Sequence, residues 1–490
     1  MSSKPQTVGY LPDERPAPLK LLLYALQQVI VMFPATVAVA ICTGFQVSTT
    51  IFASGLATIC FIFISGRKIP LYYGSSFAYL TAITSLVYAQ GTADQIRLFE
   101  ATPKVLAPEL ISYAQFGIIM SGLVSIAAGL LVRFSGRNAV EKILPPAVTG
   151  SVAMIIGLTL AGNALGDAAP AMKNGVLVSG VTGSGWAWAI SLTTLISTIL
   201  YSKYLKGILG QLPLLLGALT GCAFAGILYY FGGDSYNMFQ SMPQAALDAS
   251  LWTAGPIAVP AFSLPKISWA AVAAIMPIAI ATIPESTAHI YQLEIYVEDV
   301  AKKKNKKMKY KMSDLLHRNL IGDGICDMIS GAVGGPAGTN YGENISTMAI
   351  SKVFSVPVLV AAGIIAMVIA FFTPLIKVIY GIPTAVIGGL EIYLFGAIAA
   401  QGIAIMIDKK VDMFSSKNIA VIASIMVIGI GGQYRFGGNI PFFGMDVPCI
   451  AGAAIFGIVL NFILSIGDKK KEVESTTESN NEEASDSVAE

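Results

Sequence analysis

The sequence predicts an all-α polytopic membrane protein whose fourteen transmembrane spans form two inverted repeats of seven. Three observations predict this fold class: the composition, the distribution of Lys and Arg, and two pairs of similar short segments within the chain, here called echoes. The chain has 490 residues, of which 54% are hydrophobic and 12% are charged, and its mean hydropathy is +0.69. These values lie outside the range of an ordinary soluble domain. The chain is therefore expected to cross a bilayer repeatedly.

The expected spans follow from the lengths of the apolar runs. A bilayer core of roughly 30 Å requires about 20 apolar residues in each crossing helix, and runs near this length recur along the chain. With their breaks they give fourteen expected spans, at residues 21–42, 47–65, 74–90, 111–132, 144–164, 186–202, 207–231, 269–292, 313–333, 342–353, 355–376, 383–406, 417–432 and 447–467.

The basic residues give an independent check, because Lys and Arg are retained in cytoplasmic loops. With fourteen spans and both termini inside, most of the 31 Lys and Arg fall on the cytoplasmic side, including the lysines of residues 302–311. Removing the short third or tenth span would invert every later loop. The charges therefore favour a multi-pass protein of the plasma membrane with both ends in the cytoplasm.

A cytoplasmic tail is expected at each end of the sequence. Residues 1–20 are expected to form a cytoplasmic tail without the features of a secretory signal peptide, so the first span is itself the insertion signal. Residues 468–490, rich in Glu, Ser, Asn and Thr, are expected to be disordered in the cytoplasm. The lysine-rich run 302–311 could bind anionic membrane lipid, but a loop that fixes topology is the favoured interpretation.

Two echoes indicate the inverted repeat. Residues 73–79 (YGSSFAY) in the third span resemble residues 341–347 (YGENIST) in the tenth, and residues 145–150 (PPAVTG) resemble residues 383–388 (PTAVIG). Both pairs are seven spans apart. Because seven is odd, the two copies must cross the membrane in opposite directions. In transporters with inverted repeats, such short segments interrupted by Gly and Pro are the best sequence indication of a substrate site.

The third and tenth spans are therefore the expected site. Each should begin as an extended segment, at residues 69–73 and 336–341, and then become a half-helix whose N-terminus offers unpaired N–H groups. Glu343 lies in the first turn of the second half-helix. Glu285 and His289 of the eighth span are four residues apart and share one helix face. Ionisable groups at this depth are costly and usually functional.

Structural alternatives exist for each of these groups. Glu343 could be a helix cap and Glu285 a partner of His289, whereas His289 could be a proton carrier or a satisfied structural histidine. Further candidates are Glu391 in the twelfth span and Asp323 and Asp327 in the ninth. Asp323 stands between two glycines, where a hinge role competes with coupling.

Other chemistries are excluded or disfavoured. The five cysteines are scattered and odd in number, so no disulfide framework or cysteine metal site is expected. With only two histidines, a multi-histidine metal site is excluded, and we expect no cofactor and no nucleic-acid partner. Residues 320–323 (LIGD) lack the leading glycine of a Gly-x-Gly-Asp protease motif, and residues 74–77 (GSSF) lack the final glycine of a rhomboid-type motif. The chain is therefore not expected to be an enzyme.

Residues 335–345, with Glu285 and His289 upstream and residues 74–78 in the first half, resemble the nucleobase/ascorbate transporter family and, within it, the bacterial uracil permeases. The resemblance covers residues 20–467. It implies a core domain of spans 1–4 and 8–11 (residues 21–142 and 269–380) and a gate domain of spans 5–7 and 12–14 (143–268 and 381–467). It also implies proton-coupled uptake of a nucleobase and a homodimer formed through the gate domain.

The resemblance also implies roles for particular residues. Glu285 and Glu343 match the two carboxylates that hold the base, and His289 matches a proton-coupled histidine. Four groups match other positions of the pocket: the backbone N–H groups of Phe77 and Gly342, and the wall residues Tyr341 and Ala35. Ser76 and Phe395 are added as contacts, and Asp323 and Glu391 as coupling candidates.

Some positions depart from the family pattern and leave the base open. Phe395 stands where uracil-type members carry a tyrosine, and Glu391 where a small polar residue is usual. Residues 343–346 read Glu-Asn-Ile-Ser, whereas the purine-type signature has Gln or Glu followed by Asn-x-Gly. Uracil is the expected substrate, with xanthine, uric acid or another purine as the alternative. The coupling ion is expected to be a proton, with sodium possible. A sulfate-type anion exchanger is disfavoured because two carboxylates would repel a dianion. A channel or a pure receptor stays open as an alternative.

Overall fold

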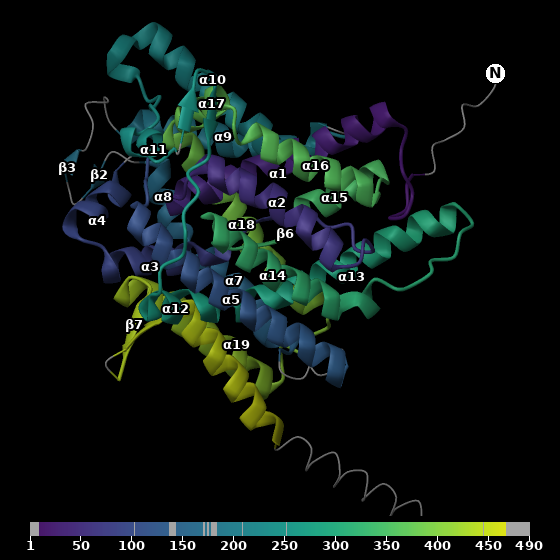
Figure 1. Cartoon of the computed structure of the whole chain (residues 1–490). Helices are drawn as coiled ribbons and strands as arrows, with labels where there is room; N and C mark the ends of the chain where they lie inside the picture. Colours follow the sequence, from purple (N-terminus) through teal and green to yellow (C-terminus); the bar gives the residue numbers. More distant parts are fainter. Residues whose placement is uncertain are drawn as a thin grey trace, which may run out of the picture.

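A computed structural model describes residues 9–101, 103–136, 144–169, 172–173, 176–177, 184–207, 209–250, 252–443 and 445–466. The fold is built from helices with short strands between them (Figure 1). The expected tail 468–490 and the first eight residues of the expected N-terminal tail lie outside the described residues, as do Arg137 and Lys142 of the charge pattern.

In the first half of the chain the elements run in the following order: α1 (Pro18–Thr43), α2 (Val47–Ile64), β1 (Tyr73–Ser75), the 3₁₀ helix η1 (Phe77–Tyr79), α3 (Leu80–Gln90), α4 (Ala93–Glu100), α5 (Pro108–Ser135), α7 (Pro146–Thr159), α8 (Ala161–Ala168), β2 (Met172–Lys173), β3 (Val176–Leu177), α9 (Ser184–Tyr204), η2 (Leu209–Gln211), α10 (Pro213–Gly232), η3 (Gly233–Tyr236), α11 (Gln244–Asp248), β4 (Trp252–Ala254) and β5 (Ile257–Val259).

The second half comprises α12 (Trp269–Ile275), η4 (Met276–Ile278), α13 (Ala279–Lys303), η5 (Ser313–Leu315), α14 (Leu316–Val333), β6 (Gly338–Asn340), α15 (Gly342–Ser351), α16 (Val356–Ile369), α17 (Thr373–Tyr380), α18 (Thr384–Asp408), α19 (Ser416–Phe436), β7 (Asn439–Phe442) and β8 (Met445–Pro448). A last helix follows at Cys449–Ile466.

Within the described residues, nine helices are long and apolar enough to cross a membrane. The chain is thus a helical, multi-pass membrane protein by length and composition. Several of the other expected spans coincide with shorter helices, such as α3, α15 and α16. The count of fourteen spans therefore stays a prediction.

The eighth expected span differs from the sequence prediction in length. Residues 269–292 were expected, but η4 interrupts the helix at Met276–Ile278 and α13 continues to Lys303. Beyond the apolar run, Lys302 and Lys303 pair with Glu298 and Asp299 one turn earlier. Such pairs support an exposed helix, so the helix extends past the apolar residues on which its predicted end depended.

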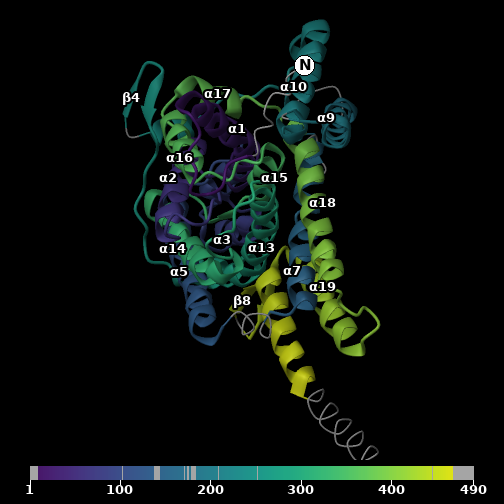
Figure 2. The same ribbon diagram turned by 90° about the vertical axis from the view of Figure 1, so that its right-hand side faces the viewer.

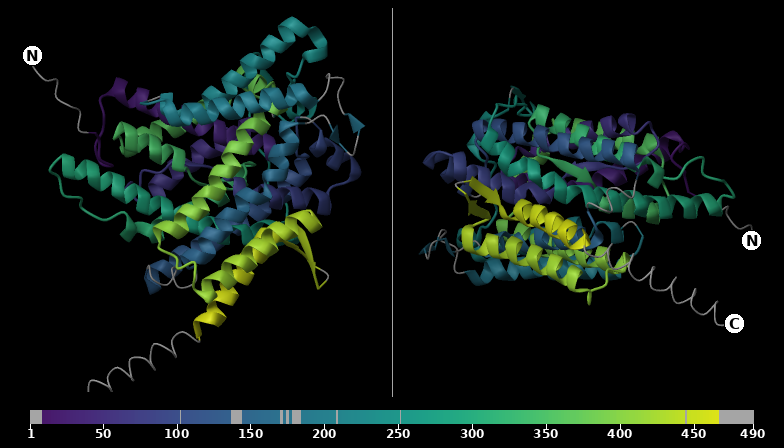
Figure 3. Two further views of the ribbon diagram at one scale, coloured as in Figure 1. Left: turned by 180° about the vertical axis from the view of Figure 1, so that it is seen from behind. Right: turned by 90° about the horizontal axis from the view of Figure 1, so that it is seen from below.

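The helices form two groups that lie side by side in two views (Figures 2 and 3). In the first group α2 and α5 pack on α14, α1 and α2 on α16, and α12 on α5. In the second group α7, α8 and α9 pack on α18, α10 on α9, and α19 on α7. We refer to these sets as the first and second helix groups. Their equivalence to the expected core and gate domains stays a prediction.

Glycine contacts allow the closest approaches in the first helix group. A Cβ atom on Gly55 of α2 would lie 2.5 Å from the carbonyl oxygen of Gly363 of α16, and one on Gly122 of α5 would lie 2.3 Å from that of Gly324 of α14. Small residues let helix backbones approach in this way when lipid supplies no hydrophobic driving force. The polar segments between these helices are therefore held in a rigid frame.

Two short strands cross inside this frame. β1 pairs antiparallel with β6, with Gly74 opposite Thr339, and two more backbone bonds extend the ladder, from Tyr341 to Tyr72 (2.9 Å) and from Ser76 to Ala337 (3.0 Å). Non-helical backbone at membrane depth needs partners of this kind for its polar groups. Because the strands are antiparallel, η1 with α3 and α15 leave the crossing in opposite directions.

A segment before α1 covers one end of the first helix group. Tyr10 and Lys352 are joined by a backbone bond of 2.8 Å, and Glu14 accepts hydrogen bonds from Lys304 and Lys306. Burial acts to raise the pKa of Glu14, but the hydrogen bonds from the two lysines and from the backbone of Leu11 lower it to about 2. We call this end, with the lysines of residues 302–311, the lysine-rich end. The opposite end is called the α4 end.

Candidate functional site

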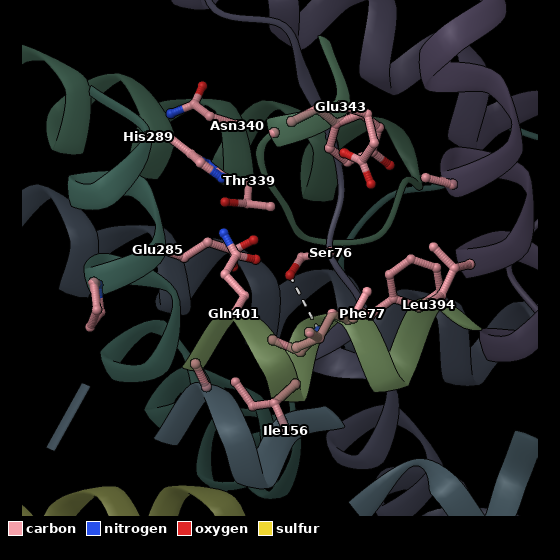
Figure 4. A pocket seen from close by; sticks show the side chains of 18 of the residues that line it. Ser76, Phe77, Ile156, Glu285, His289, Thr339, Asn340, Glu343, Leu394 and Gln401 are labelled. Carbon is pink, nitrogen blue, oxygen red and sulfur yellow. Dashed lines mark hydrogen bonds between the residues drawn. The ribbon is translucent and has the colours of Figure 1, made fainter. Parts of the chain in front are cut away.

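A cavity of about 290 Å³ lies where α1, α13, α15, α18 and the strand crossing meet (Figure 4). Eight of the residues expected from the sequence line it: Ala35, Ser76, Phe77, Glu285, His289, Tyr341, Gly342 and Glu343. They come from both halves of the chain. Figure 4 shows Glu285 and His289 of α13 on one side of the cavity and Glu343 on another, with Ser76 and Phe77 between them.

The α13 wall is formed by one face of the helix. Glu285, His289 and Gln292 line the cavity at spacings of four and three residues, as one helix face requires. His289 is 2% exposed and forms a hydrogen bond with the backbone of Asn340. Among the described residues, its Nδ1 atom has no partner.

The start of α15 places Glu343 in its first turn. A Cβ atom on Gly342 would lie 3.1 Å from His289 Nε2, so the histidine packs directly on the backbone of this turn. Asn344 points elsewhere: its Nδ2 donates to the backbone and side-chain oxygens of Gln28 on α1, at 3.0 and 2.8 Å. Asn344 thus fixes α15 against α1, while Glu343 faces the cavity.

Tyr341 connects the two strands to α1. Its hydroxyl donates to the carbonyl oxygen of Ser75 (2.9 Å) and lies 3.1 Å from Thr36 Oγ1. A Cβ atom on Gly74 would lie 2.2 Å from Cζ of the Tyr341 ring. Residue 74 must therefore be glycine for the ring to occupy this position beside Ala35.

On the opposite half-helix, Ser76 and Phe77 form the cavity wall. Ser76 Oγ accepts a hydrogen bond from the Ala78 N–H at 3.3 Å and so caps η1. The Phe77 ring contacts that of Phe395 edge to face, with centroids 5.5 Å apart. Phe395 is 2% exposed and does not line the cavity, whereas its neighbour Leu394 does. Its contact with the cavity is therefore through Phe77.

The two aspartates of α14 accept hydrogen bonds from residues of the strand crossing. Asp327 Oδ1 accepts hydrogen bonds from the Tyr73 hydroxyl and from the Gly338 N–H (2.8 Å). Asp323 Oδ1 accepts one from Asn340 Nδ2 (2.9 Å). Both aspartates are buried, and neither lines the cavity. Asp323 thus contacts the cavity residue Asn340, and its charge also interacts with that of Glu285.

Glu391 lies apart from the cavity. Although α18 contributes Leu394, Gln401 and other residues to the wall, Glu391 is 1% exposed and accepts a hydrogen bond from the Cys42 thiol at 2.5 Å. It is therefore not brought together with Glu285 and Glu343.

The cavity extends toward the lysine-rich end. Ser346 of α15 and Gln401 of α18 line it and are exposed, whereas Phe395 and Glu391, nearer the start of α18, are buried. Because α13, α15 and α18 all run toward Lys303, Lys352 and Lys409, the mouth faces these lysines.

The cavity combines acceptors with donors. Two carboxylates and the N-termini of two half-helices face a space that water and a small molecule can share. Among the described residues, no group of three or more His, Cys, Asp and Glu could hold a metal ion. The arrangement suits a small planar molecule whose edge alternates N–H groups with carbonyl oxygens.

Sequence reasoning missed several cavity residues, chiefly Gln292, Thr339, Asn340, Ser346 and Gln401. Three of them had a usable signal. Gln292 follows Glu285 by seven residues on the same helix face, and Gln401 is a polar residue within an apolar span. Ser346 follows Glu343 by three residues on α15, whereas Thr339 and Asn340 are in β6, where only the register shows which side chains point inward.

Comparison with known proteins shows the protein family to which the chain belongs. A family model described as Permease family matches residues 19–437. The chain belongs to this permease family. The relatives of this permease include the uracil permease of Bacillus caldolyticus, 33% identical over 458 residues (92% of this chain and 94% of the relative). The uracil permease of Bacillus subtilis (strain 168) is 32% identical over 484 residues (98% and 99%).

A solved structure shares the fold of the permease. The murine Solute Carrier 26 family member A9 anion transporter in the inward-facing state superimposes with a TM-score of 0.63 at 11% sequence identity, over 93% of this chain and 69% of that one. At this identity the likeness concerns the fold alone. The family match makes the protein a membrane transporter and not an enzyme.

Proposed function

We propose that this permease imports a nucleobase, with uracil as its first substrate. The observation that carries the proposal is the placement of Glu285 and Glu343 around one cavity with the N-termini of η1 and α15. A uracil edge alternates N–H donors and carbonyl acceptors, so it matches carboxylates that stand beside backbone N–H groups. The names of the two Bacillus relatives support the same substrate.

The binding roles follow from this pairing. Glu285 and Glu343 accept the N–H groups of the base, the backbone at Phe77 and Gly342 donates to its carbonyl oxygens, and Tyr341 fixes the backbone around them. A base without the matching donor would leave buried polar groups unpaired, at a cost of about 1–3 kcal/mol for each group. Selectivity should therefore concentrate on the bound edge.

The transport cycle is proposed as proton symport by alternating access. A charged carboxylate is costly to bury, so a proton held by Glu285 or His289 favours closure around a neutral base. The first helix group acts as the core domain and the second as the gate domain, within fourteen spans of two inverted repeats. The antiparallel strand crossing supports this symmetry. A homodimer through the gate domain completes the assembly.

The orientation in the plasma membrane is part of the same proposal. If the lysine-rich end faces the cytoplasm, as the charge pattern predicts, both termini are cytoplasmic and the cavity opens inward. A base that entered from outside would leave through the mouth lined by Ser346 and Gln401.

Uptake of radiolabelled uracil into proteoliposomes tests the proposal. An inward proton gradient should drive accumulation above the equilibrium level, an inward sodium gradient should not, and excess unlabelled uracil should compete better than xanthine. Glu343→Gln and Glu285→Gln should each weaken uracil binding by about 10- to 100-fold, as expected for a lost charge-assisted hydrogen bond. Glu298→Gln, which removes a carboxylate from the partly exposed side of the same helix, is the matched control.

Uptake that ignores the proton gradient would refute the coupling. Unchanged uracil binding in both glutamine variants would refute the assignment of the site. Stronger competition by xanthine than by uracil would show that the substrate is a purine.

A further inference from the structure

Four side chains meet at the α4 end of the boundary between the two helix groups. The first group contributes Cys42, from the last turn of α1, and Lys104, from the segment before α5. The second group contributes Asp167 of α8 and Glu391 of α18. The Cys42 thiol donates to Glu391 Oε1 (2.5 Å), and Lys104 Nζ lies 3.5 Å from Asp167 Oδ2. We call these four residues the α4-end cluster.

Within each helix group, backbone contacts connect the two segments that contribute residues to the cluster. On the first group, Leu106 N–H donates to the Gly44 carbonyl oxygen at 2.7 Å, which ties the segment of Lys104 to the end of α1. On the second group, a Cβ atom on Gly388 would lie 2.1 Å from the Ala168 backbone nitrogen, so α8 and α18 are in backbone contact. The cluster therefore joins two rigid surfaces.

The cluster has an excess of acid. Glu391 is 1% exposed and Cys42 3%, while the side chains of Asp167 and Lys104 are 19% and 26% exposed. The Asp167 charge acts directly on Glu391, and Glu391 Oε2 is buried without a hydrogen-bond partner among the described residues. One ammonium neutralises one carboxylate, which leaves a second negative charge in a buried place unless a proton joins it.

Lys104 keeps its charge in this setting. Burial acts to lower its pKa, but the neighbouring Asp167, Cys42 and Glu391 together raise the pKa above its usual value. No other titratable group is needed to balance the cluster. Helix α7 carries no ionisable residue; the ionisable residues of the other elements packed on α18 are Tyr201, Lys203 and Tyr204 in the last turn of α9, and Cys222, Tyr229 and Tyr230 on α10.

We propose that the α4-end cluster is a proton-binding latch: one proton shared by Asp167 and Glu391 neutralises the excess carboxylate, so that the Cys42–Glu391 and Lys104–Asp167 contacts hold the two helix groups together and close this end of the path. When the groups separate, water solvates both carboxylates and the proton leaves to the solvent at the α4 end. The proton of the latch therefore returns to the side from which it came and is not transported. Glu391 then sets how often the α4 end opens, while coupling belongs to the cavity.

The inference rests on the proposed alternating access, but its test needs no substrate. Cys42 becomes reachable only when the latch opens. Purified full-length protein is treated with a membrane-impermeant maleimide, and modification of Cys42 is followed by mass spectrometry between pH 5.5 and 8. Each rate is divided by that of the unfolded protein at the same pH, which removes the intrinsic pH dependence of the thiol.

A latch that takes up one proton changes its open population by up to about tenfold per pH unit. The corrected rate in wild-type protein should therefore rise steeply with pH. Asp167→Asn does not touch Cys42 and removes the excess carboxylate, so the latch of this variant needs no proton to close. Its corrected rate of Cys42 modification should be slow and independent of pH, and it should equal the wild-type rate at the acid end of the range. Asp94→Asn, an exposed carboxylate of α4, should behave like wild type.

Lys104→Met should change the rate of Cys42 labelling in the opposite direction. Without the ammonium both carboxyls must hold a proton for closure, so labelling should be faster at neutral pH and should depend on pH more steeply than in wild type. A flat corrected profile in wild-type protein, or faster labelling of Asp167→Asn at every pH, would overturn the latch. Failure of uracil uptake with these profiles intact would overturn only the proposed function.

Discussion

Replacing Gly74 by alanine tests whether the strand crossing positions the site. The new Cβ atom would lie 2.2 Å from Cζ and 2.3 Å from Cε2 of the Tyr341 ring, more than 1 Å short of ordinary van der Waals contact at 3.4 Å. The ring cannot turn aside freely, because its hydroxyl is bound to the Ser75 carbonyl oxygen and lies beside Thr36. Gly74 is also fixed by its pairing with Thr339.

The strain must therefore move Tyr341 and, with it, the start of α15. Overpacking of this kind costs about 1–3 kcal/mol, and loss of the Tyr341 hydrogen bond adds about 1 kcal/mol. A displacement of about 1 Å in binding groups can reduce function by about 100-fold. We expect the dissociation constant for uracil to rise by about 30- to 300-fold, with a moderate loss of thermal stability.

Isothermal titration calorimetry with uracil on purified protein measures the effect, and size-exclusion chromatography verifies the fold. Gly396→Ala is the matched control, because no atom lies within 4 Å of the Cβ it would add. In a double-mutant cycle, Tyr341→Ala should remove most of the additional effect of Gly74→Ala. Wild-type affinity in a folded Gly74→Ala protein would refute the reasoning.

Two further predictions concern stability. Asp327→Ala leaves the Tyr73 hydroxyl and the Gly338 N–H without their acceptor, at a cost of about 1–3 kcal/mol each, whereas Asp327→Asn keeps an acceptor oxygen. Thermal unfolding in detergent should therefore show a clearly larger loss of stability for the alanine variant. Equal losses of stability would contradict the role of Asp327 in supporting the strands. Glu14→Gln should destabilise by about 1–2 kcal/mol at pH 7. Because the folded pKa of Glu14, about 2, lies below the ordinary value of 4.5, its contribution is complete above pH 4.5 and is lost as the pH falls toward 2. The unfolding temperatures of variant and wild type should therefore converge in acid, and a constant gap would count against these ion pairs.

The positions of Glu285, His289 and Glu343 could be anticipated because their signals are local. A four-residue spacing places two side chains on one helix face, and a carboxylate after a Gly-rich break lies at a helix N-terminus. The helix of the eighth expected span continues past residue 292 because its second half is stabilised by charge pairs and not by apolar residues. Phe395 was expected as a contact from the family resemblance and Glu391 as a coupling candidate because it is an ionisable residue in a span, and neither lines the cavity.

The sequence by itself determined the helical membrane class, the two broken segments and the carboxylates between them, because burial in lipid restricts which residues can occupy each position. The tertiary structure decided which polar groups meet. Asp327 supports the strands, Asn344 turns to α1, and Glu391 joins Cys42 at the far end. These partners are separated by up to 349 residues along the chain, so their pairing depends on strand register and helix packing, which no local pattern encodes.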